Sequence, residues 1–207
     1  MKTGCDRLLE QLRPHIADQR VLEAMRAVPR DRFVPPELAR EAWDNAPLPI
    51  GAGQTISQPL VVARMCELLQ LHGNERILDV GTGSGYHAAV LAYLGAHVWS
   101  IERHAELSER ARINLEAAGV ANVTLVVGDG TRGLPEQAPF DAINVAAAAG
   151  AHVPSALEDQ LADGGHLVVP VENSDQRLYV VHKTTAGLER RGLERVRFVP
   201  LITGQAL

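Results

Sequence analysis

Three glycines at alternate positions, Gly81, Gly83 and Gly85, follow a short apolar run at residues 77–80 and precede helix-forming residues at 88–92. Glycine allows a positive φ and lets a ligand approach backbone atoms that a Cβ would shield, and the first turn of a helix presents unpaired N–H groups. The pattern predicts a strand that turns into a helix around a small polar ligand. A tight turn without a ligand would use the same glycines, so this motif needs support from other residues.

Two carboxylates near this turn indicate which cofactor would suit it. A dinucleotide fingerprint reads G-x-G-x-x-G and faces a pyrophosphate, whereas here the third glycine comes one residue early and Asp79 precedes the first. A carboxylate at this place repels a pyrophosphate but suits an ammonium group, which favours S-adenosylmethionine over a nicotinamide cofactor. The second predicted strand ends in Glu102, about 20 residues downstream, where such folds place the acid that accepts hydrogen bonds from the ribose hydroxyls.

A third acid, Asp129, lies between two glycines at the end of the next predicted strand. Ligands of open parallel sheets bind beyond the carboxyl ends of the strands, where this carboxylate could accept a hydrogen bond from the exocyclic amine of adenine. The alternative is an ordinary Asp-Gly turn. The alignment of Asp129 with Asp79 and Glu102 at successive strand ends favours the adenine site.

The elements that must position these residues alternate along the chain. Helices or long crossovers separate the apolar β segments, which predicts a parallel, doubly wound α/β sheet. A strand opened by Gly164-Gly165 and alternation at residues 178–180 and 196–198 predict an antiparallel ending. The predicted strands are residues 76–80, 97–101, 123–127, 140–145 and 166–171, and the helices among them end at Leu94 and span 105–118.

The first 58 residues predict a helical cover and a binding loop. Helices are expected from Asp6, as N-cap, to Pro14 and from Asp18 to Pro29, followed by an ordered linker and a short helix. Residues 47–59 are too rich in Gly and Pro for a regular element, yet they carry polar groups with no charge, which is typical of a binding loop. Pro59 suits the first turn of the next helix, so Ser57 or Gln58 would fall at or just before its N-cap.

Length and composition limit the class of protein. We expect one domain over residues 1–207, with the cover and loop at 1–58 and the core at 59–207, because 207 residues with 46% hydrophobic content suit one α/β domain. A net charge of −5 provides no overall basic field for nucleic acid or anionic membrane, and the basic cluster at 190–197 has acids interleaved. Without a signal-peptide-like start or a membrane-length apolar run, we expect a cytoplasmic protein, and a monomer.

The cysteines and histidines do not indicate a metal or a nucleophile. The two cysteines, Cys5 and Cys66, lie far apart in predicted helices, which favours a reduced protein in which neither thiol has an activating partner. The eight histidines form no H-E-x-x-H or close Cys/His set, so we expect no metal and place them at the surface or at helix ends. Asn144, on a predicted buried strand, is expected to be satisfied by neighbouring backbone.

Motifs spread over nearly the whole chain are similar to those of the protein-L-isoaspartate O-methyltransferase family. The glycine turn is shared by many methyltransferases, but residues 54–59 together with the ending at 198–201 are particular to this family. The segments that carry the resemblance are residues 32–35, 43–45, 53–59, 81–86, 100–103, 128–130, 138–141 and 196–201.

The resemblance implies a Rossmann-like class I methyltransferase fold and S-adenosylmethionine as methyl donor. It also implies methylation of the free α-carboxylate of L-isoaspartyl residues in damaged proteins and peptides, with the family's active-site serine at Ser57. Thr55, Ile56, Ser57 and Val199 are the expected substrate-binding residues. The expected cofactor-binding residues are Asp79, Gly81, Thr82, Gly83, Ser84, Gly85, Glu102, Arg103, Asp129 and Gly130.

Methylation of an α-carboxylate agrees with the residues present, because a carboxylate with a pKa of about 3.5 is ionised at neutral pH and needs no strong base. Some positions depart from the family's pattern. Ala146 replaces the usual Thr after the fourth strand, Asn144 stands where an aliphatic residue is common, His87 replaces a frequent Gln, and Glu172 replaces a usual Gly. Two alternatives therefore stay open: methylation of another acceptor, such as a small molecule, another peptide carboxyl or RNA, and cofactor binding without catalysis.

Overall fold

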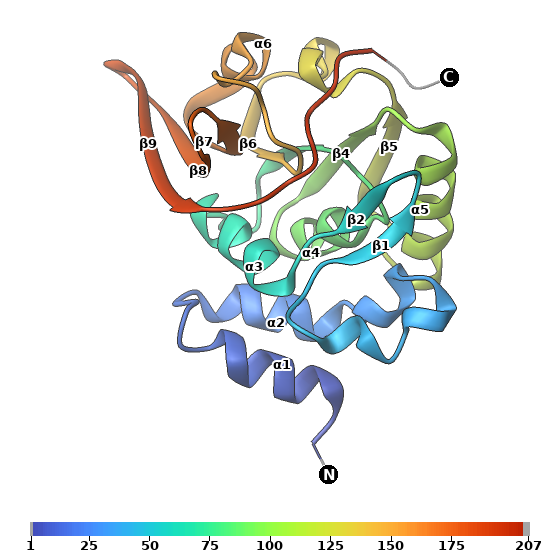
Figure 1. Cartoon of the computed structure of the whole chain (residues 1–207). Helices are drawn as coiled ribbons and strands as arrows, with labels where there is room; N and C mark the ends of the chain where they lie inside the picture. Colours follow the sequence, from blue (N-terminus) through green and yellow to red (C-terminus); the bar gives the residue numbers. More distant parts are fainter. Residues whose placement is uncertain (1, 205–207) are drawn as a thin grey trace.

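The structure is a computed structural model that describes residues 2–204. Its centre is a seven-stranded sheet in the order β5-β4-β3-β6-β7-β8-β9 (Figure 1). Strands β5 to β7 in this order are parallel, and β8 and β9 add antiparallel hairpins to β7. The predicted parallel core with an antiparallel ending is confirmed. The strands are β3 (Arg76–Val80), β4 (His97–Glu102), β5 (Val123–Val127), β6 (Phe140–Val145), β7 (Leu161–Glu172), β8 (Gln176–Thr184) and β9 (Gly187–Arg195).

Two details of the predicted ending were wrong. Strand β7 begins at Leu161, so Gly164-Gly165 lies inside it rather than before it, and the chain at these glycines forms an irregularity in the pairing with β6. Residues 196–198 follow the end of β9 and do not continue it. Their alternation of apolar and charged residues reflects a segment that packs one side of an extended chain against the core, where Val196 and Phe198 are half-buried.

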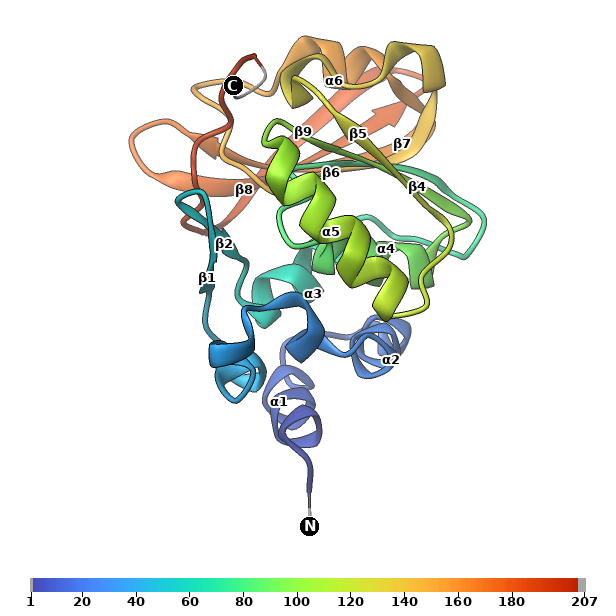
Figure 2. The same ribbon diagram turned by 90° about the vertical axis from the view of Figure 1, so that its right-hand side faces the viewer.

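Helices cover both faces of the sheet, as the side view shows (Figure 2). Neighbouring strand residues point to opposite faces, so Ile77 packs into the core cluster with α3, α4 and α5, and Leu78 packs into the cluster with α6. This double burial explains why β3 has apolar residues on both faces. The helices are α1 (Gly4–Leu12), α2 (Gln19–Ala27), α3 (Pro59–Leu68), α4 (Tyr86–Leu94), α5 (Ala105–Ala117) and α6 (Ser155–Asp159), with short 3₁₀ helices at Arg30–Phe33, Pro36–Leu38, Glu41–Trp43, Gly130–Arg132 and Pro135–Gln137.

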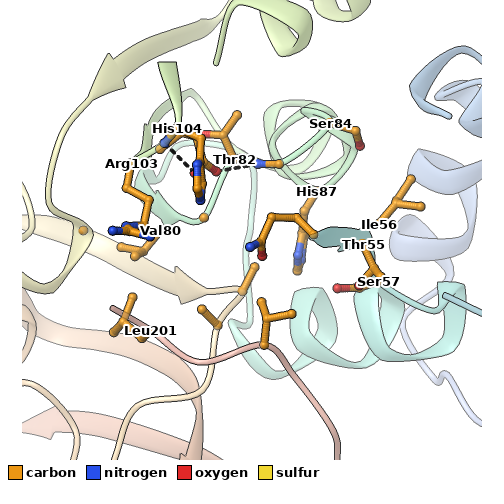
Figure 3. Close-up of a pocket in the computed structure, with 18 of the residues that line it drawn as sticks. Thr55, Ile56, Ser57, Val80, Thr82, Ser84, His87, Arg103, His104 and Leu201 are labelled. Atoms are coloured by element: carbon orange, nitrogen blue, oxygen red, sulfur yellow. Dashed lines mark hydrogen bonds between the residues drawn. The ribbon is translucent and has the colours of Figure 1, made fainter. Parts of the chain in front are cut away.

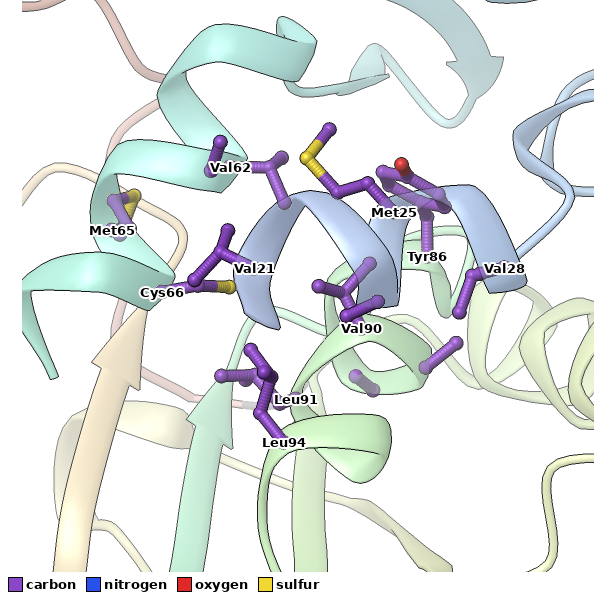
Figure 4. Packing of buried hydrophobic residues seen from close by; sticks show 14 of the residues in the cluster. Val21, Met25, Val28, Val62, Met65, Cys66, Tyr86, Val90, Leu91 and Leu94 are labelled. Atoms are coloured by element: carbon purple, nitrogen blue, oxygen red, sulfur yellow. The ribbon is translucent and has the colours of Figure 1, made fainter. Parts of the chain in front are cut away.

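The predicted helical cover consists of α1 and α2, which lie beneath α3 and α4 (Figures 1 and 4). Met25 of α2 packs among Val62 of α3 and Tyr86 of α4 in one buried cluster. The second helix begins next to Asp18, close to its predicted start, and Asp18 is its N-cap; the N-cap of α1 is Thr3 rather than the predicted Asp6. Asp6 instead completes a capping box, because its carboxylate accepts a hydrogen bond from the Thr3 N–H while the Thr3 hydroxyl accepts one from the Asp6 N–H.

The guanidinium of Arg30 is buried between the N-terminal cover and α4. The side chain is fully buried, its Nε donates to the Ala42 carbonyl at 2.9 Å, and its guanidinium lies 4.9 Å from the Tyr86 ring centroid. Burial lowers the pKa of Arg30 to about 10. The residue therefore joins the 3₁₀ segments to α4 through both hydrogen bonding and packing.

Arg30→Ala should lower the free energy of unfolding by about 2–4 kcal/mol, because it leaves a cavity and an unpaired buried carbonyl. Urea denaturation measures this loss. Arg13→Ala, at an exposed arginine after α1, is the matched control and should change stability by less than about 0.5 kcal/mol. Equal stability of the two variants would contradict the structural role of Arg30.

Candidate active site

A pocket lies at the carboxyl ends of β3 and β4, where ligands of open α/β sheets bind (Figure 3). Three segments distant in sequence form its walls: the glycine turn after β3, the residues 54–57 before α3, and the chain after β9. The lining residues from these segments and the strand ends include Gln54, Thr55, Ile56, Ser57, Val80, Gly81, Thr82, Gly83, Ser84, His87, Glu102, Arg103, His104, Gly130, Ala146, Val199, Pro200, Leu201 and Ile202.

The segment expected to be an irregular binding loop is a β-hairpin. Strands β1 (Leu48–Gly51) and β2 (Gln54–Ile56) pair antiparallel, with Pro49 opposite Thr55. Its turn is Gly51-Ala52-Gly53, where all three residues have positive φ, so the glycines that argued against a regular element instead form the turn. Gln54 and Thr55 of β2 and Ser57 directly after it line the pocket, which is where the predicted loop was expected to lie.

Ser57 lies at the junction of this pocket and a neighbouring groove of about 430 Å³. Gln58, not Ser57, is the N-cap of α3, and its side chain makes no capping hydrogen bond. The Asn45 side chain, 15 residues earlier in the chain, accepts a hydrogen bond from the Leu60 N–H at 3.0 Å and so caps the helix in place of Gln58. Ser57 is therefore not used as a helix cap, and it points into the pocket with Thr55 nearby (Figure 3).

The glycine turn has the conformation that its spacing predicts. Gly81, Gly83 and Gly85 have φ of 96°, 53° and 89°, a region that favours glycine. A Cβ on Gly83 would approach Ile50 Cδ1 to 3.2 Å, which would crowd the contact between the turn and the hairpin. The absence of Cβ atoms leaves backbone accessible from the pocket.

Glu102 lies at the end of β4 and faces the pocket with its carboxylate. Oε2 accepts from the Gly83 N–H at 2.9 Å and Oε1 accepts from the His104 N–H at 3.0 Å. A carboxylate has about four acceptor positions, so each oxygen can still accept a ribose hydroxyl. This geometry fits the predicted ribose residue.

Asp79 does not line the pocket. The carboxylate is fully buried behind the glycine turn, where Oδ2 accepts from Ser100 Oγ at 2.7 Å and Oδ1 accepts from Asn144 Nδ2 at 2.7 Å. Burial raises the pKa of Asp79 to about 6, against the effect of these two donors. The direct contact with a ligand ammonium that was expected of Asp79 has no support in this geometry. Its negative charge would instead act on the ligand from behind the glycine turn.

Asp129 is likewise engaged within the protein. Oδ1 accepts from Thr131, and Oδ2 accepts from the Gly204 N–H at 2.8 Å, while Arg103 Nε donates to the Gly204 carbonyl at 3.2 Å. The segment after β9 thus lines the pocket and joins two predicted cofactor residues. Gly130, not Asp129, lines the pocket, and the adenine contact of Asp129 stays a prediction.

Some pocket residues were missed or misplaced by the sequence. His87 was expected at the surface or at a helix end; it lies in the first turn of α4, but it is buried in the pocket wall. Asn144 contacts the side chains of Asp79 and His87 rather than backbone. Cys66, which was expected to have no activating partner, lies 3.5 Å from His87 Nε2, but burial raises the pKa of this thiol well above its usual range, which agrees with that expectation. Leu201 and His104 also line the pocket. Leu201 belongs to the family-like segment 196–201, whereas no motif in the sequence indicated His104.

Within residues 2–204, no group of three or more His, Cys, Asp or Glu side chains is arranged to hold a metal ion. No helix in this part of the chain is long and apolar enough to cross a membrane.

Known proteins are similar to this chain over nearly its whole length. The family model for protein-L-isoaspartate(D-aspartate) O-methyltransferase matches residues 4–206. The chain is 52% identical over 202 residues to the protein-L-isoaspartate O-methyltransferase of Chromobacterium violaceum, covering 96% of this chain and 90% of that protein, and 52% identical to that of Aeromonas hydrophila, covering 96% and 97%. A structure from Plasmodium falciparum, described as this enzyme in complex with S-adenosyl-L-homocysteine, superposes with a TM-score of 0.84 at 27% identity, covering 97% and 99% of the two chains.

The parallel core, the glycine turn and the acid at the end of β4 define a class I S-adenosylmethionine-dependent methyltransferase. Within this class, the chain belongs to the protein-L-isoaspartate(D-aspartate) O-methyltransferase family. The resemblance found in the sequence is confirmed.

Proposed function

We propose that this protein transfers a methyl group from S-adenosylmethionine to the free α-carboxylate of L-isoaspartyl residues in damaged proteins and peptides, and so initiates their repair. The observation that carries this proposal is the position of Ser57, which lines both the pocket at the glycine turn and the adjoining groove. A substrate group in the groove would there meet a cofactor in the pocket. Thr55 and Val199 line the same junction.

The residues present fit the cofactor. The turn at residues 81–85 leaves room for close backbone contact, Glu102 offers acceptors for the ribose, and Gly130 lines the wall where adenine is expected. At Gly130 a Cβ would come within 2.5 Å of Val80 Cγ1, so any other residue would have to displace the Val80 side chain. When bound, S-adenosylmethionine supplies a methyl group made electrophilic by its sulfonium.

The protein's part of the reaction is binding, orientation and exclusion of water. The substrate carboxylate is already ionised at neutral pH, because its pKa is about 3.5, so no side chain has to remove a proton. The Ser57 hydroxyl donates a hydrogen bond to one carboxylate oxygen and orients the other toward the methyl group, assisted by Thr55 or by backbone N–H groups of β2. The hairpin and residues 199–202 close the site from two sides, which strengthens these interactions by excluding water.

The later repair step belongs to the substrate. In the methyl ester, the neighbouring backbone nitrogen attacks the ester carbonyl and expels methanol, which gives a succinimide. Hydrolysis of the succinimide partly restores normal aspartate. No residue of this protein is needed for that step.

A peptide pair that differs only in isoaspartate against aspartate tests the proposal. Incubation with methyl-labelled S-adenosylmethionine should give a base-labile methyl ester on the isoaspartyl peptide alone. Methyl transfer to neither peptide, with measurable cofactor binding, would contradict the proposal and point to another acceptor or to a cofactor-binding module. A monomeric protein in the cytoplasm, with no nucleic acid partner, also stays a prediction, and light scattering tests its monomeric state.

A further inference from the structure

The side chain of Asn144 contacts two parts of the cofactor site at once. Its Nδ2 atom donates to Asp79 Oδ1 at 2.7 Å and lies 3.2 Å from His87 Nδ1. The side chain is fully buried on β6, and its Oδ1 atom has no hydrogen-bond partner among the described residues. A buried unsatisfied oxygen costs stability, so an amide at this place calls for a physical reason.

These contacts assign the protons of the cluster. The acceptor Asp79 requires that the amide nitrogen of Asn144 faces it, which directs the second N–H at His87 Nδ1, and that nitrogen must then be unprotonated. The His87 proton therefore lies on Nε2, which is 3.5 Å from Cys66 Sγ. Both ring nitrogens of His87 are engaged inside the protein, although the ring lines the pocket.

The cluster continues on the other side of Asp79. Ser100 Oγ donates to Asp79 Oδ2 at 2.7 Å, and Thr82 Oγ1 lies 2.6 Å from Ser100 Oγ. Thr82 and His87 both line the pocket (Figure 3). A buried chain of hydrogen bonds therefore joins two parts of the pocket wall, and Asn144 is the link between its two halves.

We propose that Asn144 is a positioning residue of the cofactor site, which keeps Asp79 ionised behind the glycine turn and holds His87 as a neutral ring in the pocket wall. The inference rests on the proposed function, because it takes the ligand of this pocket to be a cation. A buried carboxylate attracts the ammonium and sulfonium groups of S-adenosylmethionine through a medium of low dielectric constant. A neutral imidazole does not repel them, as an imidazolium would.

Asn144 serves Asp79 and His87 together, because one amide group contacts both side chains. An aliphatic residue at 144 would leave the Nδ1 atom of His87 without a donor, and Asp79 would keep only the donor Ser100.

The ionisable groups around Asp79 make its charge depend on Asn144. The pKa of Asp79 is raised to about 6: burial and the charge of Glu102 on β4 raise it, and the hydrogen bonds from Ser100 and Asn144 limit the rise. Cys66 on α3 and His87 on α4 are also packed here; burial raises the pKa of the thiol and lowers the pKa of His87 to about 3, so both are neutral at pH 7. Loss of the Asn144 donor should therefore leave Asp79 partly protonated at neutral pH.

Asn144→Val tests this through the pH dependence of S-adenosyl-L-homocysteine affinity, measured by isothermal titration calorimetry. A carboxylate is charged above its pKa, so a pKa raised by about one unit, from about 6, should weaken binding about twofold at pH 7 and leave it close to wild type at pH 8.5. Asn173→Val, at an exposed turn after β7, is the control and should bind like wild type at each pH. A loss of equal size at every pH would indicate a packing defect and would overturn the proposal.

A second measurement needs no variant. In wild-type protein labelled with ¹⁵N at histidine, His87 should stay neutral with its proton on Nε2 down to pH 5. A His87 that titrates near its ordinary pKa, or that carries its proton on Nδ1, would overturn the proposal even if Asn144→Val does not fold. Failure of the wild-type protein to bind S-adenosyl-L-homocysteine at any pH would instead refute the proposed function.

Discussion

Ser57→Ala should lower kcat by about 10- to 100-fold, the effect of losing one hydrogen bond to a charged group. The hydroxyl lies at the junction of the pocket and the groove and is not used to cap α3. Because its proposed partner is the substrate carboxylate, the Kd of S-adenosyl-L-homocysteine should stay within about twofold of wild type. Steady-state rates with the isoaspartyl peptide and calorimetry with the cofactor product measure the two effects.

Ser155→Ala, at the exposed first residue of α6, is the matched control and should change neither quantity. A Ser57 variant that loses cofactor affinity and turnover in equal proportion would show that the serine supports the pocket wall rather than the substrate. An unchanged kcat would remove Ser57 from the reaction.

Glu102→Ala should weaken S-adenosyl-L-homocysteine binding by about 100-fold, because hydrogen bonds from two ribose hydroxyls to a buried carboxylate would be lost. The variant also removes the acceptor of the Gly83 N–H, so part of the loss comes from the glycine turn. Glu102→Gln retains one acceptor oxygen and should lose less. Calorimetry with S-adenosyl-L-homocysteine and with a 2′-deoxy analogue separates the ribose contact from the turn.

The 2′-deoxy analogue separates the loss of the ribose contact from the effect on the glycine turn. Wild type should bind it more weakly than the parent compound, and Glu102→Ala should bind the two about equally. Glu106→Ala, at an exposed acid in the first turn of α5, is the control and should bind like wild type. A Glu102→Ala variant with unchanged affinity would remove this residue from the ribose site.

The sequence predicted the parallel core well, because its signal is strong there. Strands such as β3 are apolar on both faces and are followed at once by glycines and helix-forming residues, a pattern with few other structural solutions. Glu102 was predicted for the same reason, since the end of β4 fixes its place beside the turn. Local rules of composition were therefore enough to place the turn and one acid.

Contacts between distant segments could not be read from the sequence. Residues 47–59 were expected to be irregular, but Arg110 of α5 donates to the Ile50 carbonyl and holds the hairpin against the core. The Asp129 carboxylate was assigned to adenine, and only the folded chain shows that Gly204 donates to it from 75 residues away. Such contacts depend on tertiary geometry, which periodicity does not contain.

Burial also changed the meaning of single polar residues. Asp79 was expected in contact with a ligand because it precedes the glycine turn, but its side chain points away from the pocket and is held by Ser100 and Asn144. A residue one position along a strand faces the other side of the sheet, so adjacency in sequence did not imply adjacency in the site. His87 was expected at the surface or at a helix end, and it does lie at the start of α4, but the apolar residues that follow it make this a helix buried on nearly all sides.

A crystal structure with S-adenosyl-L-homocysteine and an isoaspartyl peptide tests the central claim most directly. The account predicts the nucleoside against residues 81–85, its ribose at Glu102, and the peptide carboxylate between Ser57 and the sulfur atom. Cofactor product bound elsewhere, or a peptide carboxylate on the side of the sulfur remote from Ser57, would contradict the account.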